Sequence, residues 1–158
     1  MPATIRLQSA DFDAGAEAAL VARGRTDIGA VVTFTGICRG DETGAPVAAM
    51  VLEHYPGMAE AEIARHMAEA EARWPLIGAT IIHRHGRLLP GDNIVLVVTA
   101  AAHRGDAFAA AEFLMDYLKT RAPFWKKIER PDGAAWVDAK SADDAAAERW
   151  TAQRPAAE

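Results

Sequence analysis

Three of the four lysines of this chain, Lys119, Lys126 and Lys127, lie within nine residues of one another, although arginine outnumbers lysine thirteen to four. Lys126 directly follows two aromatic residues, so its ammonium is expected beside large apolar surface. Desolvation lowers the pKa of a lysine amine and makes it available as a base, a nucleophile or a proton donor, roles that a guanidinium does not fill. The lysine cluster therefore marks a candidate catalytic site.

Only two of these lysines can share one site. Lys119 ends a predicted helix, where the helix dipole would stabilise a cation even without a function. Lys126 and Lys127 are consecutive in a predicted strand, and successive side chains of a strand point to opposite faces. We expect Lys119 and Lys126 to form the catalytic pair.

Arg39 lies between two glycines, Gly36 and Gly40, which let the backbone come close to a ligand. Its guanidinium offers a forked set of donors to an oxyanion. On these residues alone, a hairpin turn with a solvated arginine is the simpler interpretation. The neighbouring Cys38 suggests sulfur chemistry, but a lone cysteine in a strand is usually a small buried apolar residue, and we expect a structural thiol.

His103 and Arg104 leave a predicted strand and enter a helix for which Asp106 is the expected cap. A helix start presents free N–H groups and the positive end of the dipole, so these two residues could build a phosphate or carboxylate site. Two solvated side chains in a loop fit the sequence equally well.

Composition excludes several classes of protein. With 158 residues, a formal charge of −5 and one cysteine, the chain is expected to form one domain over residues 1–150, without an internal disulfide or a metal site. An acidic chain does not favour general nucleic-acid binding. Neither an apolar membrane span nor a secretory signal is present, and a cytoplasmic location is the default.

The order of elements predicts a mixed α+β fold. We expect the strand at 47–54 to return along the strand at 28–37 across a polar turn, and Asp11 to cap the first helix. Residues 151–158 are expected to be a disordered tail. Strands are predicted at 28–37, 47–54, 77–85, 93–101, 125–130 and 134–137, and helices at 12–22, 58–73, 107–120 and 142–150.

Several strings occur in an order and spacing that resemble the large, catalytic subunit of molybdopterin synthase. The resemblance covers about residues 28–150. The strings are GAVVTFTGICRG (29–40), LEHYPGMAE (52–60), HRHGRLLPGDNIVLV (83–97), AAHRGDAF (101–108), FLMDYLKTRAPFWKK (113–127) and DGAAWVDA (132–139). The resemblance implies an α/β hammerhead-like core with a small additional antiparallel β subdomain.

The resemblance also implies a reaction and partners. The family forms the dithiolene of molybdopterin by moving two sulfurs to cyclic pyranopterin monophosphate from the C-terminal glycine thiocarboxylate of a small ubiquitin-like carrier subunit. It implies a homodimer of large subunits with one small subunit at each end, a heterotetramer overall. This chemistry requires no metal or redox cofactor.

Matched to the family's motifs, Lys119 and Lys126 belong to the catalytic pocket. The family commonly has an acidic residue after its two basic ones, whereas this chain has Ile128 and then Glu129, to which an orienting role would pass. The implied substrate-binding residues are Ile37, Cys38, Arg39, His103, Arg104, Lys127 and Ile128.

Helix length suggests that the site is shared. The predicted helix of about 14 residues separates His103 and Arg104 from Lys119 by roughly 20 Å, too far for one small substrate. We therefore expect His103 and Arg104 of one protomer to face Lys119 and Lys126 of its dimer mate. Two alternatives are a lysine enzyme that forms a Schiff base and a non-catalytic module that binds a phosphate ligand or a protein partner.

Overall fold

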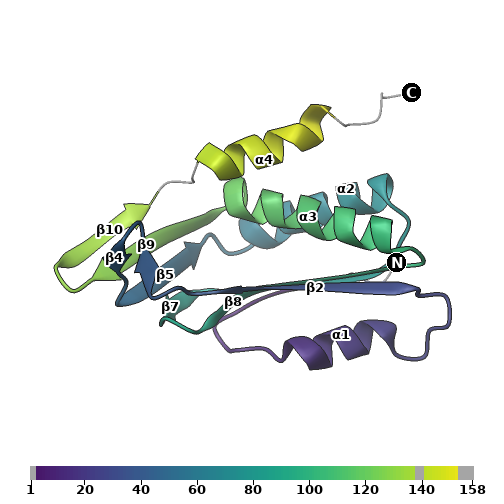
Figure 1. Ribbon diagram of the computed structural model, residues 1–158, viewed down its shortest axis with the longest axis horizontal. Helices are drawn as coiled ribbons and strands as arrows, with labels where there is room; N and C mark the ends of the chain where they lie inside the picture. Colours follow the sequence, from purple (N-terminus) through teal and green to yellow (C-terminus); the bar gives the residue numbers. More distant parts are fainter. Residues whose placement is uncertain (1–2, 138–140, 153–158) are drawn as a thin grey trace.

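The computed structural model describes residues 3–137 and 141–152, and its two main β-sheets lie end to end along the long axis of the molecule (Figure 1). The helices are α1 (Ala14–Ala22), α2 (Met58–Arg73), α3 (Arg104–Thr120) and α4 (Ser141–Ala152). The strands are β1 (Ala3–Gln8), β2 (Ala30–Ile37), β3 (Asp41–Glu42), β4 (Ala45–Pro46), β5 (Ala49–His54), β6 (Leu76–Arg84), β7 (Gly86–Leu88), β8 (Asn93–Ala101), β9 (Phe124–Arg130) and β10 (Gly133–Val137).

The larger sheet has the strand order β1-β6-β8-β2, with β1 parallel to β6 and the other pairs antiparallel. Its central strands β6 and β8 are almost continuously apolar because both of their faces are covered. Helices α2 and α3 cover one face, α4 lies on α3, and α1 covers the opposite face (Figure 1). The main core fills the space between this sheet and α2, α3 and α4.

The smaller sheet is fully antiparallel, with the order β10-β9-β5-β7. Six buried residues form its own core: Cys38, Val47, Met50, Leu52, Leu88 and Ile128. Together the two sheets confirm the expected α+β class with an added β subdomain. One expected pairing is wrong, because β5 does not return along β2 but pairs with β7 and β9 in the smaller sheet.

Both expected helix caps are also wrong. The N-cap of α1 is Asp13, which accepts a hydrogen bond from the Ala16 amide at 2.9 Å, and α3 begins at Arg104 with His103 as its N-cap. Asp106 instead lies in the first turn of α3, where its charge is favourable to the dipole. Strands β1 and β7 were not predicted, because they are short or weakly apolar.

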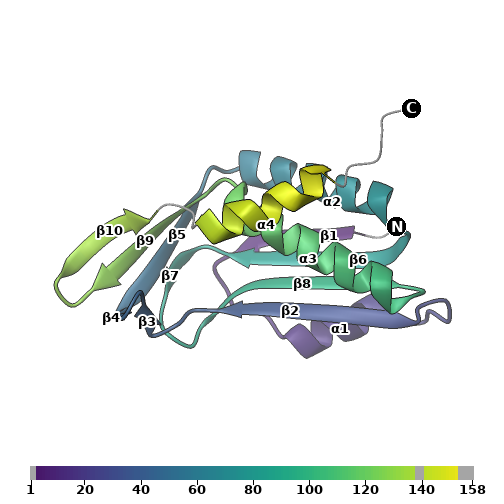
Figure 2. The same cartoon turned by 45° about the horizontal axis from the view of Figure 1, so that its top comes forward.

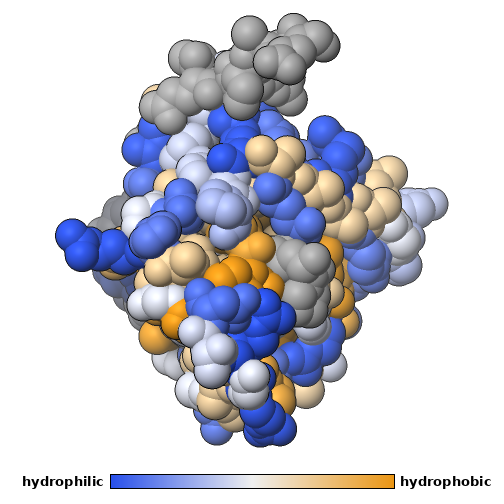
Figure 3. Space-filling model, turned by 90° about the vertical axis from the view of Figure 1, so that its right-hand side faces the viewer, coloured by the Kyte–Doolittle hydropathy of each residue, from blue (hydrophilic) through white to orange (hydrophobic). Residues whose placement is uncertain are grey.

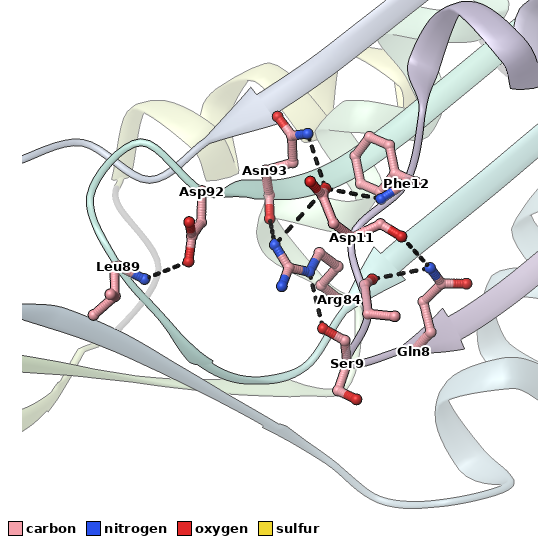
Figure 4. A network of polar contacts seen from close by, with 9 residues as sticks. Gln8, Ser9, Asp11, Phe12, Arg84, Leu89, Asp92 and Asn93 are labelled. Atoms are coloured by element: carbon pink, nitrogen blue, oxygen red, sulfur yellow. Dashed lines mark hydrogen bonds and ion pairs between the residues drawn. The ribbon is translucent and has the colours of Figure 1, made fainter.

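Asp11 is unavailable as a cap because it belongs to a polar network that ties the β1–α1 turn to β6 and β8 (Figure 4). Its carboxylate accepts hydrogen bonds from Asn93 and from the Phe12 amide, and these bonds lower the pKa of Asp11. Arg84 lies at the centre and donates to the Ser9 and Asn93 carbonyls at 3.0 and 2.9 Å. The network fixes the end of the larger sheet that adjoins the smaller one.

The segment before β2 lies very close to the end of β8. The Gly29 amide donates to Ala101, and a Cβ at Gly29 would come within 2.1 Å of the Ala102 carbonyl oxygen, so only glycine fits. The start of β2 therefore adjoins the start of α3.

The C-terminal helix extends further than expected. Helix α4 continues to Ala152, so the first two residues of the expected tail are helical, and 153–158 lie outside the described residues. None of the helices in the described part of the chain has the length and apolar character needed to cross a membrane.

We predict that Arg84→Met lowers the free energy of unfolding by about 1–3 kcal/mol, because Arg84 is mostly buried and two carbonyls lose a charged donor. Urea unfolding monitored by circular dichroism measures the change. Arg87→Met is the matched control: its ion pair with Glu129 is solvent-exposed, and its loss should cost at most about 1 kcal/mol. Equal losses in the two variants would contradict the central role of Arg84.

Candidate active site

A cavity of about 660 Å³ lies where the two sheets meet the C-terminal end of α3. Figure 2 shows the end of β2, the end of α3 and the strands β5 and β9 converging at this place. The last turns of α3 contribute Met115, Leu118 and Lys119, and β9 contributes Phe124, Lys126 and Ile128. The segment from Phe34 to Glu42 forms much of the opposite wall.

Lys119 and Lys126 both line this cavity, although they come from different elements. Lys126 is held by an ion pair with Glu42, in which its Nζ donates to Oε1 at 3.0 Å. Lys119 is exposed in the last turn of α3.

Glu42 is a site residue that sequence reasoning missed. It is 9% exposed on the two-residue strand β3. Its carboxylate pairs with Lys126, a contact that was expected of Glu129. Glu129 instead forms an ion pair with Arg87 at 3.1 Å. The only signal in the sequence was that Glu42 belongs to a polar turn, which is equally typical of solvated residues.

Arg130 fixes the β3–β4 hairpin that carries Glu42. Its guanidinium donates to the carbonyls of Ala45, Pro46 and Glu42 at 3.0 to 3.3 Å. The turn between the two strands has Thr43 and Gly44 in the left-handed region, with φ of 55° and 78°. The position of the Lys126 ammonium therefore depends on a short hairpin that is anchored from β9.

One segment at the end of β2 lines the cavity with Ile37, Cys38 and Arg39. The exposed Arg39 guanidinium makes no hydrogen bond or ion pair to any residue within 3–137 or 141–152. Cys38 is buried in the core of the smaller sheet, and burial raises the pKa of its thiol. The thiol therefore stays protonated near neutral pH, as expected for a structural cysteine. Ile128 is 4% exposed and forms part of the apolar wall.

The other three expected substrate-binding residues lie outside this cavity. Lys127 points to the opposite face of β9, where its ammonium lies 5.5 Å from the ring centre of Trp136. His103 and Arg104 are exposed at the other end of α3, which at 17 residues separates His103 from Lys119 by about 24 Å. Within one chain, His103 and Arg104 therefore lie far from the cationic side chains of the cavity.

His83 is a second residue that sequence reasoning did not place in the site. It lies near the end of β6, is 6% exposed, and lines the cavity. Its ring stacks on Phe124 with centres 4.0 Å apart, and its Nδ1 lies 2.8 Å from the Arg84 carbonyl oxygen. Burial lowers the pKa of His83 to about 4, so the imidazole is neutral near pH 7. Its position on the same strand face as His85 was visible in the sequence, but its burial was not.

This arrangement defines the class of protein. A partly apolar cavity with two amines, a guanidinium that has no partner in the described chain and a neutral imidazole can accept an anionic group. The same groups can move protons and stabilise charge at a reacting carbonyl. These are the features of an enzyme active site.

Comparison with known proteins identifies the family. Residues 7–121 match the family model described as MoaE protein. The molybdopterin synthase catalytic subunit of Mesorhizobium japonicum is 63% identical over 149 residues, which cover 93% of this chain and 92% of that protein. This chain belongs to the MoaE family of molybdopterin synthase catalytic subunits.

Solved structures agree with this assignment. The molybdopterin biosynthesis MoaE protein of Burkholderia ambifaria is 56% identical, with a TM-score of 0.80 over 94% of this chain and 98% of that one. A molybdopterin synthase structure from Staphylococcus aureus is 31% identical, with a TM-score of 0.76 over 84% of this chain and 95% of that one. The likeness in fold therefore extends beyond the residues that the family model covers.

The buried His83 predicts a pH dependence of stability. Between its folded pKa of about 4 and its ordinary value of 6.5, the unfolded chain binds a proton that the folded chain does not. The free energy of unfolding should therefore fall as the pH is lowered from about 6.5 to 4, by up to about 3 kcal/mol from this group.

His83→Phe keeps the stacking on Phe124 but removes the titrating group. Urea unfolding across this pH range should give a flatter dependence for the variant than for the unaltered protein, whatever the offset at pH 7. Identical slopes in the two proteins would show that His83 is not buried in its neutral form.

Proposed function

We propose that this chain transfers two sulfurs from the thiocarboxylated C-terminal glycine of a small carrier subunit to cyclic pyranopterin monophosphate, forming the dithiolene of molybdopterin. The observation that carries the proposal is that one cavity brings together Lys119, Lys126 and Arg39 from three separate segments. Lys119 and Lys126 match the lysines of the family's catalytic pocket, and Arg39 matches its substrate-contacting turn. The reaction belongs in the cytoplasm, where such cofactor synthesis would occur.

Each sulfur transfer needs an acid. Attack by the thiocarboxylate sulfur forms a C–S bond at the pterin side chain and breaks a C–O bond, and the departing oxygen requires a proton. Lys119 donates that proton, and its charge stabilises the carbonyl oxygen when water later hydrolyses the acyl link to the carrier. Lys126, positioned by Glu42, holds the substrate and shares the proton transfer.

Lys119 is an exposed residue that lines the cavity, so whatever fills the cavity removes water from around its amine. The carrier's C-terminal tail and the pterin together exclude water from the amine when they fill the cavity. Lys119 is then tuned for catalysis only when both substrates are bound, which protects the thiocarboxylate from hydrolysis before the pterin arrives.

The anion-binding residues come from a second copy of the chain. Strand β2 is an edge of the larger sheet and exposes Val31, Phe34 and Ile37, and Phe108 of α3 is exposed nearby. Apolar side chains along an open edge are suited to pairing with another strand. The end of the molecule that carries the starts of β2 and α3 shows apolar areas beside charged ones (Figure 3).

Antiparallel pairing of β2 with its copy has the required geometry. Strand β2 spans about 23 Å, nearly the length of α3, so pairing would set the start of one copy beside the end of the other. Because Ala30 pairs with Ala101, the start of β2 adjoins His103 and Arg104. Each pocket would then hold His103 and Arg104 of one protomer with Arg39, Lys119 and Lys126 of its mate. With one carrier at each end, the assembly is a heterotetramer.

The direct test is incubation of the purified chain with thiocarboxylated carrier and cyclic pyranopterin monophosphate, followed by assay for the dithiolene product. Lys119→Arg keeps the charge but not a transferable proton, and should lower the rate at least about 100-fold. The matched control is Lys127→Arg, because Lys127 lies outside the cavity and keeps its charge over Trp136.

Other outcomes of this assay separate the alternatives. A Schiff-base enzyme would be trapped by borohydride on Lys119, whereas sulfur transfer passes through no imine. A binding module would lose affinity for the carrier in Lys119→Ala, and the unaltered chain would form no dithiolene. Either result would overturn the proposed reaction.

The shared pocket is tested by mixing an Arg104→Ala chain with a Lys119→Ala chain. Each homodimer lacks one group in both pockets, but a mixed dimer has one intact pocket and one doubly altered pocket. Activity above that of either parent, approaching half of that of the unaltered dimer per mixed dimer, is expected. If mixed dimers form, as native mass spectrometry would show, and remain inactive, each pocket is built from one chain.

A further inference from the structure

His83 has one ring nitrogen fixed by the protein and one that faces the catalytic cavity. The Arg84 carbonyl can only accept a hydrogen bond, so Nδ1 carries the proton and donates to it at 2.8 Å. Nε2 then bears the lone pair. No hydrogen bond to Nε2 is formed within the described part of the chain, and Nε2 is not one of its fully buried atoms without a partner. Since the cavity borders the ring, the lone pair is open to the cavity.

The ring cannot easily turn away. Phe124 stacks on its face at an interplanar angle of 14°, and the residue is 94% buried in a strand of the larger sheet. Burial is the main cause that lowers the pKa of His83, and the nearby charge of Lys119 acts in the same direction. The imidazole is therefore neutral and can accept a hydrogen bond. His54 and His85 stack on each other at 4.6 Å and do not line the cavity.

The two carboxylates of the cavity already take part in contacts within the protein. Glu42 is paired with Lys126, and Asp41 accepts a hydrogen bond from the Gly44 amide in the β3–β4 turn. The Cys38 thiol is buried and protonated. Among the described residues that line the cavity, His83 is the only one with an imidazole, a side chain far more basic than a hydroxyl.

We propose that His83 is the general base that activates water for hydrolysis of the acyl link between the carrier and the pterin. This proposal rests on the sulfur-transfer function and assigns the half of it that the lysines do not serve. Lys119 must regain a proton from solvent before its charge can stabilise the carbonyl oxygen, and an ammonium cannot take a proton from water.

The step balances without any further reactant. The water oxygen bonds to the acyl carbon while its proton passes to Nε2 of His83. The C–S bond then breaks, and the sulfur stays on the pterin as a thiolate. The carrier leaves with a C-terminal carboxylic acid, which releases the second proton of the water to solvent and becomes a carboxylate. The imidazolium beside Lys119 returns its proton to solvent, which the neighbouring positive charge favours.

The experiment follows the carrier–pterin adduct by intact-mass spectrometry during a single turnover at pH 7.5. His83→Gln should let the first C–S bond form but slow hydrolysis about 100-fold or more, so that the adduct accumulates. His54→Gln is the matched control, because His54 lies behind Phe124 and outside the cavity. It should turn over like the unaltered chain without accumulating adduct.

A second variant separates chemistry from folding. His83→Ala leaves a hollow in the cavity wall, and added imidazole should restore hydrolysis of the accumulated adduct. Circular dichroism checks that both His83 variants are folded at pH 7.5.

Three results would overturn the proposal. His83→Gln could hydrolyse the adduct at the normal rate, or a folded His83 variant could fail to form the first C–S bond. The third is that added imidazole does not restore hydrolysis in His83→Ala. The sulfur-transfer function fails differently, because the unaltered chain would then form neither adduct nor dithiolene.

Discussion

The length of α3 is the constraint on which the site depends. A rigid helix of 17 residues places His103 and Arg104 at one end and Lys119 at the other, about 24 Å apart. Shortening the helix would uncover the core formed by Phe113, Leu114 and Leu118, so packing fixes the separation. Within one chain these groups are too far apart to contact one small molecule, which is why the proposed pocket draws on a second copy.

The smaller sheet supplies what α3 lacks. Strand β9 follows α3 after a short turn and contributes Lys126 to the cavity at the end of the helix. Ile128 of the same strand is buried in the separate core of the smaller sheet. Two independent cores thus hold the two lysines, one behind α3 and one behind β9. The cavity lies between the two cores, and residues of both contribute to its apolar wall.

The bounds of helices and strands could be predicted from the sequence more accurately than the pairing of the strands. Helix α2 and strand β8 have the bounds predicted from periodicity and from the Pro-Gly breaks beside them, because those signals are local. The pairing of β5 with β9 was not predicted, since it joins residues about 75 apart and no local pattern specifies it. Asp11 fits the local rule for a cap, but the distant Asn93 and Arg84 engage it instead.

The same distinction applies to the site. Lysine chemistry and motif spacing indicated Lys119, Lys126 and Arg39, and strand alternation separated Lys126 from Lys127. Glu42 and His83 could not be found this way, because their roles arise from burial and from contacts across 84 and 41 residues, with Lys126 and Phe124. Their residue types are common, and only the fold distinguishes them from solvated side chains.

The β3–β4 hairpin has a consequence for how this protein can diverge. An exposed turn normally tolerates insertions and substitutions, so sequence changes there are usually neutral. Here the hairpin carries the carboxylate that pairs with Lys126, and Arg130 holds the hairpin through its backbone carbonyls rather than through side chains. Evolution is free to change most side chains of this turn but not its length, so relatives that lengthen it must find another anchor for the lysine.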